Sequence, residues 1–466
     1  MSGGLVDAFA DRLPFRFTGE QTEIAGLIET ELARVHPMHR LLQGEVGSGK
    51  TVLALRAMLQ VVDAGGQAAL LAPTEVLAAQ HAVTINDLLG DLAQAGTLGG
   101  SDVGTKVVLL TGSMSAAARR AALLDAASGT AGIVIGTHAL IRDHVQFAEL
   151  GLVVIDEQHR FGVEQRDALR GKAPAPPHML VMTATPIPRT VAMTVFGDLE
   201  VSELHELPAG RARVTSAVVP VAEHPSWLDR AWQRIREEVG QGRQAYVVCS
   251  RIDLDEGDDT GRAPLRSVEE TAAELTEGQL SGLRVEMLHG RMAPEDKDRV
   301  MQSFAAGEVD VLVSTTVIEV GVDVPNATVM VILDADRFGV SQLHQLRGRI
   351  GRGGHSGLCL LVTAVDPGST SMERLTAVAS TRDGFELSRI DLEQRREGNV
   401  LGIEQSGGRS SLKLLSVLRD EDVIERARAA ATQHLATDPE LAASPALAEA
   451  TRRLEDSEQA EYLEMT

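Results

Sequence analysis

Apolar runs alternate with amphipathic stretches from residue 13 to about residue 213. The runs have the length of buried strands and fall at 68–72, 107–110, 133–135, 152–155 and 179–182, and a further strand is predicted at 40–43. Strands that alternate with helices form a parallel sheet covered by helices on both faces. We therefore predict a first α/β domain over residues 1–215.

A second alternating series follows a linker-like segment at 207–210. Its apolar runs fall at 245–249, 285–288, 311–313, 329–333 and 358–362. This series predicts a second α/β domain over residues 216–380, and the two domains could be structural duplicates. From about residue 366 the pattern turns helical, with a glycine-rich interruption at 398–408. We predict a helical third region over residues 381–466 that ends in exposed, frayed helices.

Composition narrows the class of protein. Aromatic residues make up only 3% of the 466 residues, so the cores must pack mainly Ala, Val, Leu and Ile. Cys249 and Cys359 lie far apart in apolar runs, which predicts buried reduced thiols and no disulfide or cysteine-based metal site. The apolar runs fall short of the ~20 residues of a membrane span, and the first residues do not resemble a signal peptide. We expect a soluble cytoplasmic protein.

The formal net charge of −22 argues against a generally basic nucleic-acid-binding surface. A local groove lined by basic, hydroxyl or amide groups could still contact DNA phosphates, while acidic faces elsewhere limit non-specific binding. The acidic cluster at 253–259 is typical of a solvated loop.

The most specific string in the chain is GEVGSGKT at 44–51, a complete phosphate loop between a predicted strand and a helix. Its glycines let backbone N–H groups surround the phosphates, Lys50 reaches the β- and γ-phosphates, and Thr51 binds Mg²⁺. The string predicts an ATP site that includes Gly44, Gly47, Ser48, Gly49, Lys50 and Thr51.

A second string, DEQH at 156–159, directly follows the apolar run 152–155. Asp156 at a strand end can hold Mg²⁺, and Glu157 can orient and deprotonate the attacking water. Gln158 and His159 could sense the γ-phosphate and transmit its presence.

A third string, QLRGRIGR at 345–352, lies in the second domain about 300 residues after the phosphate loop. Planar, permanently charged Arg349 and Arg352 suit the negative charge that develops on a transferred phosphoryl group, and Gln345 begins the string. Hydrolysis would then require the two domains to close together. This coupling predicts an NTP-driven motor.

Two shorter features bear on the same site. Thr183 and Thr185 follow the run 179–182 and could link the nucleotide site to a nucleic-acid face, although Pro186 could also make this an ordinary turn. Gln21, with Thr18 before it, offers a donor and an acceptor to an adenine edge; a helix cap is the alternative.

With these residues in place, the chain resembles superfamily 2 helicases of the RecG type. The stretches that carry the resemblance are APTEVLAAQH (72–81), GTHALI (136–141), DEQHRFGVEQR (156–166), MTATPIPRT (182–190) and STTVIEVGVD (314–323). The transcription-repair coupling factor Mfd has a similar motor. The serine in the phosphate loop and the stretches at 136–141 and 156–166 favour RecG.

The resemblance implies two tandem RecA-like domains followed by a helical translocation element. It also implies ATP-dependent translocation on duplex DNA and remodelling of stalled forks and Holliday junctions in repair and recombination. Gly321 and Asp323 would join the nucleotide site. The residues implied to contact DNA are Pro73, Thr74, Thr137, Arg291, Thr315, Thr316, Arg395 and Gln405.

The chain also departs from the family pattern. Arg396 stands where the translocation element usually has glycine, and Glu404 lies in a segment that is more often neutral or basic. Glu45 replaces a more common aspartate, with little effect expected. The motor begins at about residue 13, without the N-terminal wedge domain of RecG proteins, so the chain is either a fragment or a short form.

The sequence leaves three hypotheses for the function of the chain. The leading hypothesis is an ATP-dependent DNA helicase or translocase that acts as a monomer, with single-strand-binding protein as a candidate partner. An Mfd-like translocase would need an RNA polymerase-binding module, and nothing in the sequence resembles one. A regulatory ATP-binding module would bind nucleotide with little stimulation by DNA.

Overall fold

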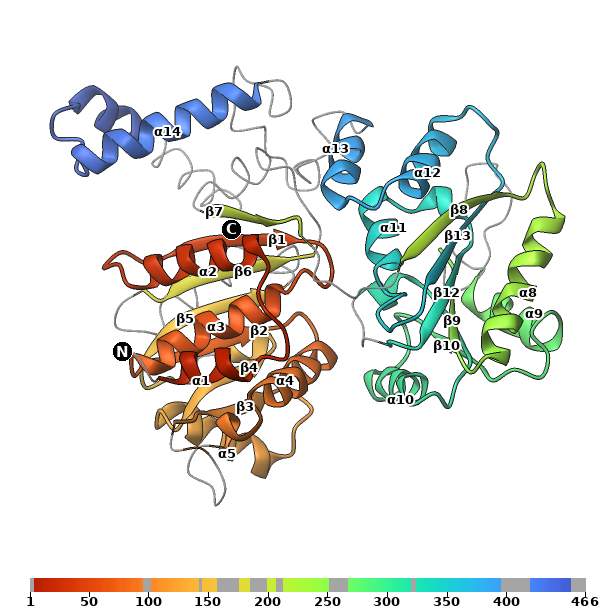
Figure 1. Cartoon of the computed structure of the whole chain (residues 1–466), viewed down its shortest axis with the longest axis horizontal. Coiled ribbons are helices and arrows are strands. Elements are labelled where there is room, and N and C mark those ends of the chain that lie inside the picture. Colours follow the sequence, from red (N-terminus) through yellow and green to blue (C-terminus); the bar gives the residue numbers. More distant parts are fainter. Residues whose placement is uncertain are drawn as a thin grey trace. The chain divides into compact units, whose positions relative to one another are not determined.

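The computed structural model describes residues 4–94, 101, 103–141, 145–156, 176–184, 199–206, 213–250, 267–319, 324–394 and 420–453. The chain divides into two compact units, one of residues 1–188 and 198–394, the other of residues 189–197 and 395–466. The larger unit contains two parallel sheets (Figure 1).

Seven strands form the first sheet, in the order β3-β4-β2-β5-β6-β1-β7, and all neighbours pair in parallel. The strands are β1 (His39–Gly44), β2 (Gln67–Leu71), β3 (Lys106–Leu110), β4 (Ala131–Gly136), β5 (Leu150–Asp156), β6 (His178–Thr183) and β7 (Glu200–Leu204). The helices are α1 (Leu5–Arg12), α2 (Gly19–Leu32), α3 (Lys50–Asp63), α4 (Glu75–Leu89) and α5 (Ala116–Ala127), with short 3₁₀ turns η1 (Gly90–Ala93) and η2 (His138–Ile141).

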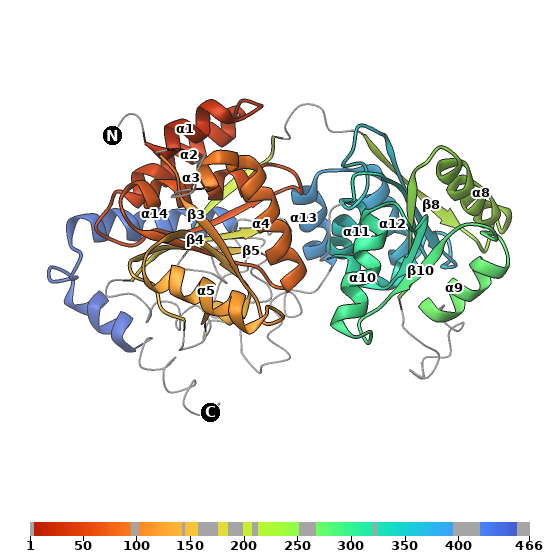
Figure 2. The same cartoon turned by 90° about the horizontal axis from the view of Figure 1, so that it is seen from below.

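Helices cover both faces of this sheet. Side chains of α1, α2, α3 and α4 share one core with alternate residues of the strands, such as Leu70, Ile133 and Val154. The α5 helix lies across the sheet from α3 (Figure 2). Along the chain, β1, β2 and β3 lie progressively closer to one edge of the sheet, and β4 turns back toward the other edge. Because crossovers between parallel strands are right-handed, this reversal places α5 on the face opposite α3.

The second sheet has six parallel strands in the order β10-β11-β9-β12-β13-β8. These are β8 (Val214–Pro220), β9 (Gln244–Val248), β10 (Val285–Leu288), β11 (Val311–Ser314), β12 (Ala327–Ile332) and β13 (Gly357–Thr363). The helices are α8 (Ser226–Gly240), α9 (Val268–Glu277), α10 (Pro294–Ala305), α11 (Val340–Arg347), α12 (Thr370–Ser380) and α13 (Gly384–Gln394), with 3₁₀ turns η4 (Thr316–Glu319) and η5 (Ala335–Arg337). One core packs α8 and α9 on the sheet, and another packs α10 to α13 on its other face.

The two sheets are duplicates, as the sequence pattern suggested. If β1 to β6 are matched in order with β8 to β13, these six strands have the same order in both sheets. A buried glutamine begins β2 and β9 alike, and a register shift follows both Gln67 and Gln244. Each amide donates to two backbone carbonyls of neighbouring segments, at 2.6–3.0 Å. The repeated glutamine therefore ties the start of its strand to two neighbouring segments in each sheet.

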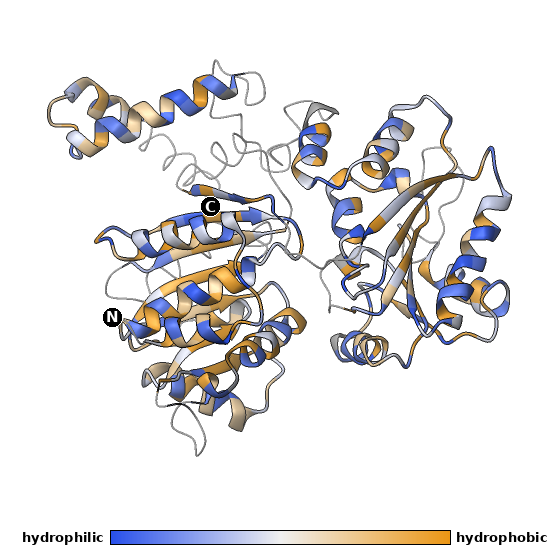
Figure 3. Cartoon of the chain, in the orientation of Figure 1, coloured by the Kyte–Doolittle hydropathy of each residue, from blue (hydrophilic) through white to orange (hydrophobic). Residues whose placement is uncertain are grey.

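The predicted strand runs are confirmed in both sheets, whereas β7 and β8 were not predicted. Both lie at an edge of a sheet and mix exposed and buried positions, so they lack a continuous apolar run. Figure 3 shows the inner strands of both sheets as mostly hydrophobic. The helical pattern after residue 366 is confirmed by α12, α13 and α14 (Glu421–Thr437), and α14 is largely exposed. The linker at 207–210, the acidic cluster at 253–259 and the glycines at 398–408 lie outside the described residues.

Both cysteines are buried free thiols, as predicted. Complete burial raises the pKa of Cys359 to about 12, so this thiol stays protonated and unreactive. A helix able to span a bilayer is absent from the part of the chain that the structure describes.

Candidate nucleotide and DNA site

The phosphate loop joins the carboxyl end of β1 to the first turn of α3. Gly47 and Gly49 adopt positive φ angles of 82° and 90°, which only glycine tolerates readily. A Cβ at Gly44 would lie 2.8 Å from the Cβ of Leu204 and 2.9 Å from the Ser48 hydroxyl. The glycines therefore permit a tight turn that directs backbone N–H groups at the start of a helix, the usual arrangement for binding phosphate.

Lys50 and Ser48 have the surroundings expected of phosphate ligands. Lys50 is 9% exposed, and its ammonium group donates to the carbonyl oxygens of Gly44 at 2.7 Å and Glu45 at 2.9 Å. The Ser48 hydroxyl is fully buried and has no hydrogen-bond partner among the described residues. A buried unsatisfied hydroxyl is costly, and a bound phosphate oxygen would satisfy it. The loop therefore fits a nucleotide phosphate.

Gln21 holds the phosphate loop from α2. Its side-chain oxygen accepts the N–H of Thr18 at 3.0 Å and the Thr18 hydroxyl accepts the N–H of Gln21 at 3.3 Å, which together form a capping box. The Gln21 amide also donates to the carbonyl of Ser48 at 2.7 Å. The helix-cap alternative is therefore observed, and the same side chain also positions the loop.

Asp156 ends β5 at the edge of the sheet where the phosphate loop leaves β1. The β6 strand lies between them, and its last residue, Thr183, pairs with Gln43. Parallel strands bring their carboxyl ends to one edge, which is where α/β sheets bind ligands. Asp156 accepts a hydrogen bond from His81 of α4 at 2.7 Å. Glu157, Gln158, His159 and Thr185 lie outside the described residues.

The arginine string of the second sheet contains one arginine with a structural role. Gln345 and Arg347 are buried in α11, while Arg349 and Arg352 follow the helix. The Arg347 guanidinium donates to the carbonyls of Val378 at 2.8 Å and Thr381 at 2.7 Å. Arg347 therefore anchors the string to the end of α12. Its seven-residue spacing from buried Val340 places it on the inward face of α11, a signal that was present in the sequence.

Glu45 stands where an aspartate is more common, and little effect was expected, but its side chain makes several contacts. Its carboxylate accepts the N–H of Gly384, the first residue of α13, at 2.6 Å and the Nε2–H of His344 of α11 at 3.0 Å. Arg347 donates to Nδ1 of His344 at 2.7 Å, which leaves the proton on Nε2. Burial raises the pKa of Glu45, but the bonds from His344 and Gly384 and the charge of Arg347 outweigh it, and the pKa stays below its ordinary value.

The residues implied to contact DNA lie at the carboxyl edges of both sheets. Pro73 and Thr74 follow β2, and Thr137 follows β4; Arg291 follows β10, and Thr315 and Thr316 follow β11. Two of the threonines implied to contact DNA are buried, since Thr137 is 2% exposed and Thr315 is 8% exposed. Their side chains are thus less accessible than Thr74, the N-cap of α4. Gly321, Asp323, Arg395, Arg396, Glu404 and Gln405 lie outside the described residues.

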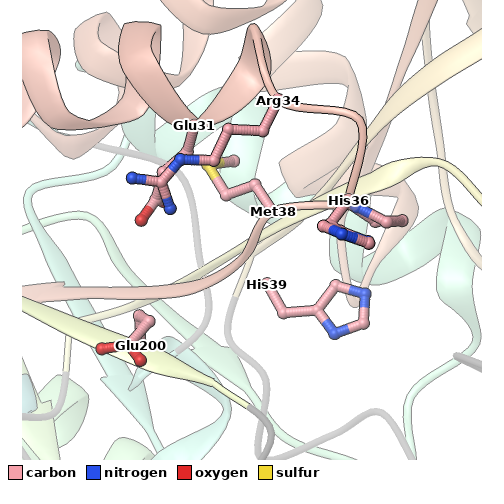
Figure 4. Close-up of a pocket in the computed structure, with 7 residues that line it drawn as sticks. Glu31, Arg34, His36, Met38, His39 and Glu200 are labelled. Atoms are coloured by element: carbon pink, nitrogen blue, oxygen red, sulfur yellow. The ribbon is translucent and has the colours of Figure 1, made fainter. Parts of the chain in front are cut away.

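A pocket of about 270 Å³ lies at the opposite edge of the first sheet, away from the phosphate loop. Side chains from the end of α2, the loop after it, β1 and β7 line it, among them Arg34, His36, His39 and Glu200 (Figure 4). It contains none of the residues of the three strings. Among the described residues, no group of three or more His, Cys, Asp or Glu side chains could hold a metal ion by itself.

Known protein families match three consecutive parts of the chain. Residues 28–194 match the DEAD/DEAH box helicases, and residues 229–354 match the helicase conserved C-terminal domain. Residues 381–461 match the C-terminal part of domain 3 of ATP-dependent DNA helicase RecG. The chain is similar to RecG helicases.

Individual RecG proteins are similar to this chain over nearly all of its length. ATP-dependent DNA helicase RecG from Mycobacterium leprae is 55% identical over 472 residues, which cover 99% of this chain and 63% of that protein. The protein of the same name from Mycobacterium bovis is 56% identical over 462 residues, which cover 97% of this chain and 62% of that protein. A solved structure of RecG bound to a three-way DNA junction has a TM-score of 0.71 and 38% identity, covering 90% of this chain and 52% of that one. The chain thus spans less than two thirds of the length of these relatives.

Proposed function

We propose that this chain is the motor of an ATP-dependent DNA helicase that translocates on duplex DNA and remodels branched DNA, including stalled forks and Holliday junctions. The main support for the proposal is that the proposed catalytic and nucleotide-binding residues are divided between two sheets of the same topology. One holds the phosphate loop and Asp156 at its carboxyl edge. The other holds Gln345, Arg349 and Arg352 and has no phosphate loop in its sequence. The junction-bound relative supports branched DNA as the substrate.

In this proposal the phosphate loop binds the nucleotide. Lys50 exchanges its two carbonyl contacts for the β- and γ-phosphates, and the buried Ser48 hydroxyl donates to a phosphate oxygen. Thr51 and Asp156 hold Mg²⁺, which neutralises charge on the phosphates when bound. Gln21 holds the loop in the required shape, and Thr18 stabilises Gln21.

Hydrolysis requires groups from both sheets. Glu157 orients and deprotonates the attacking water, and Arg349 and Arg352 stabilise charge on the γ-phosphate, a contribution of roughly 10³ to 10⁵ in rate for such arginines. Gln345 holds the string beside them, and Gly321 and Asp323 complete the site. Closure of the site on ATP and its release after hydrolysis would then alternate, as a translocase requires.

DNA contacts in this proposal are mainly to phosphates, which position the duplex without reading sequence. They come from 73–74 and Thr137 on one sheet and from Arg291 and 315–316 on the other. The residues proposed to link nucleotide and DNA are Gln158, His159, Thr183 and Thr185. Arg395 and Gln405 belong to the proposed translocation element.

The proposed domains are residues 1–215, 216–380 and 381–466, and the support for them is that each of the three family matches lies within one domain. Two buried free thiols suit a reducing compartment, which supports a cytoplasmic location. We further propose that the chain acts as a monomer with single-strand-binding protein as a partner.

Steady-state ATP hydrolysis tests this function. Rates should be compared without DNA, with single-stranded DNA, with linear duplex and with a synthetic fork of the same length. Stimulation by duplex, and more strongly by the fork, is the expected result. Equal rates in all four samples would refute the motor and favour the regulatory ATP-binding module.

A further inference from the structure

We propose that His81 couples DNA contact to the Mg²⁺-binding acid of the nucleotide site, with α4 as the rigid connection. This inference rests on the proposed function, because it assigns a path between the two sites that the function requires. The geometry that suggests it is a hydrogen bond of 2.7 Å between Nε2 of His81 and Oδ2 of Asp156.

The order of strands divides the first sheet into two halves. Asp156 and the phosphate loop leave β5 and β1, while the residues proposed to contact DNA leave β2 and β4. In the order β3-β4-β2-β5-β6-β1, the boundary between the halves lies between β2 and β5. The α4 helix follows β2 on the DNA side, and its His81 reaches across this boundary to the end of β5.

The first turn of α4 is fixed at the DNA-facing edge. The Thr74 hydroxyl caps the helix by accepting the N–H of Leu77 at 3.3 Å. The Glu75 carboxylate accepts the N–H of Gly112 at 2.8 Å and the hydroxyl of Ser113 at 2.5 Å, both in the loop after β3. A displacement of either loop by DNA would therefore move the start of α4.

His81 lies on the same face of α4, seven residues or about two turns beyond Thr74. Buried Leu77 and Ala78 lie between them against the core, so this part of the helix moves as one body. The side chains of His81 and Asp156 are only 12% and 16% exposed. A carboxylate accepts only, so Nε2 of His81 carries the proton, and the bond fixes the orientation of the carboxylate.

The test compares His81→Ala, His81→Gln and Val83→Ala. Gln keeps an N–H donor at a similar distance, whereas Val83 is 61% exposed on the outer face of α4 and serves as the control. One readout is the factor by which duplex DNA stimulates ATP hydrolysis. A second readout needs no turnover: the ratio of duplex affinities with and without Mg²⁺ and a non-hydrolysable ATP analogue, which measures the coupling free energy directly.

We expect His81→Ala to reduce both the stimulation factor and the affinity ratio by about tenfold, equivalent to about 1.4 kcal/mol. The affinity for duplex without nucleotide should stay within twofold of the original. His81→Gln should restore most of the coupling, and Val83→Ala should leave it unchanged. An unchanged affinity ratio in His81→Ala, or an equal loss of ATP hydrolysis with and without DNA, would overturn the inference. If the original chain shows no stimulation by DNA, the proposed function fails and this inference fails with it.

Discussion

Replacement of Arg347 by methionine should destabilise the second sheet and its helices by about 3 kcal/mol. Arg347 is 4% exposed, and its guanidinium donates three hydrogen bonds of 2.7–2.8 Å, to Val378, Thr381 and His344. Bonds from a charged donor contribute about 1.5–3 kcal/mol each. Burial lowers the pKa of Arg347, so removal of the charge recovers part of its desolvation cost, several kcal/mol in such sites. The difference leaves a net loss of about 3 kcal/mol.

Tryptophan fluorescence during urea unfolding isolates this part of the chain. Both tryptophans of the sequence, Trp227 and Trp232, lie in α8, and Trp232 is 3% exposed. Arg299→Met provides a matched control, because the Arg299 side chain is 62% exposed and its ion pair with Asp296 is a surface pair. Such pairs contribute at most about 1 kcal/mol. If both variants unfold within 0.5 kcal/mol of each other, roughly the scatter of surface substitutions, the anchoring role of Arg347 is refuted.

Three further predictions concern catalysis, DNA binding and pH. Lys50→Ala should abolish ATP hydrolysis, and Glu157→Gln should bind ATP without turning it over; normal turnover in either variant would contradict the site assignment. Duplex affinity should fall with salt with a log–log slope of about −0.9 per neutralised phosphate, and a flat response would exclude a phosphate-tracking interface. Nδ1 of His178 accepts the N–H of Met38 at 2.8 Å, and burial, with the charge of His39, lowers the pKa of His178. As the pH decreases, the unfolded chain then binds a proton at this histidine before the folded chain does. The free energy of unfolding should therefore fall as the pH decreases through about 6.5 and level off below the pKa of His178 in the folded chain. In urea unfolding, His178→Asn should lose less of this free energy between pH 7.5 and 5.5 than the original chain.

The sequence predicted the parts of the fold that depend on continuous apolar runs. The inner strands of both sheets are buried on both faces, so their hydrophobic runs are unmistakable. The edge strands β7 and β8 mix polar and apolar residues, because one side or one end meets solvent. The pattern therefore could not separate them from loops. The duplicate topology was suggested by the two alternating series and is confirmed by the strand order.

The candidate site was predictable where chemistry requires a fixed spacing. The phosphate loop and the strand-terminal Asp156 are such cases, because backbone geometry and strand position define them. His81 and Arg347 were missed as individual contributors. Their partners are Asp156, 75 residues away, and carbonyls about 30 residues away. The spacing of Arg347 from Val340 indicates an inward-facing side chain, but no local pattern identifies the partner at such a separation. Arg347 illustrates this limit, because it precedes Arg349 and Arg352 in the same string, and a different role is proposed for those two arginines.

The central claim is that ATP hydrolysis by this chain drives movement along duplex DNA. Displacement of a third DNA strand from a triplex tests it most directly, because a translocating motor removes that strand without unwinding the duplex beneath. We predict displacement that requires ATP, increases with the length of duplex available for loading, and is lost in Lys50→Ala. Third-strand release at the same rate without ATP, or no release despite DNA-stimulated ATP hydrolysis, would contradict the claim.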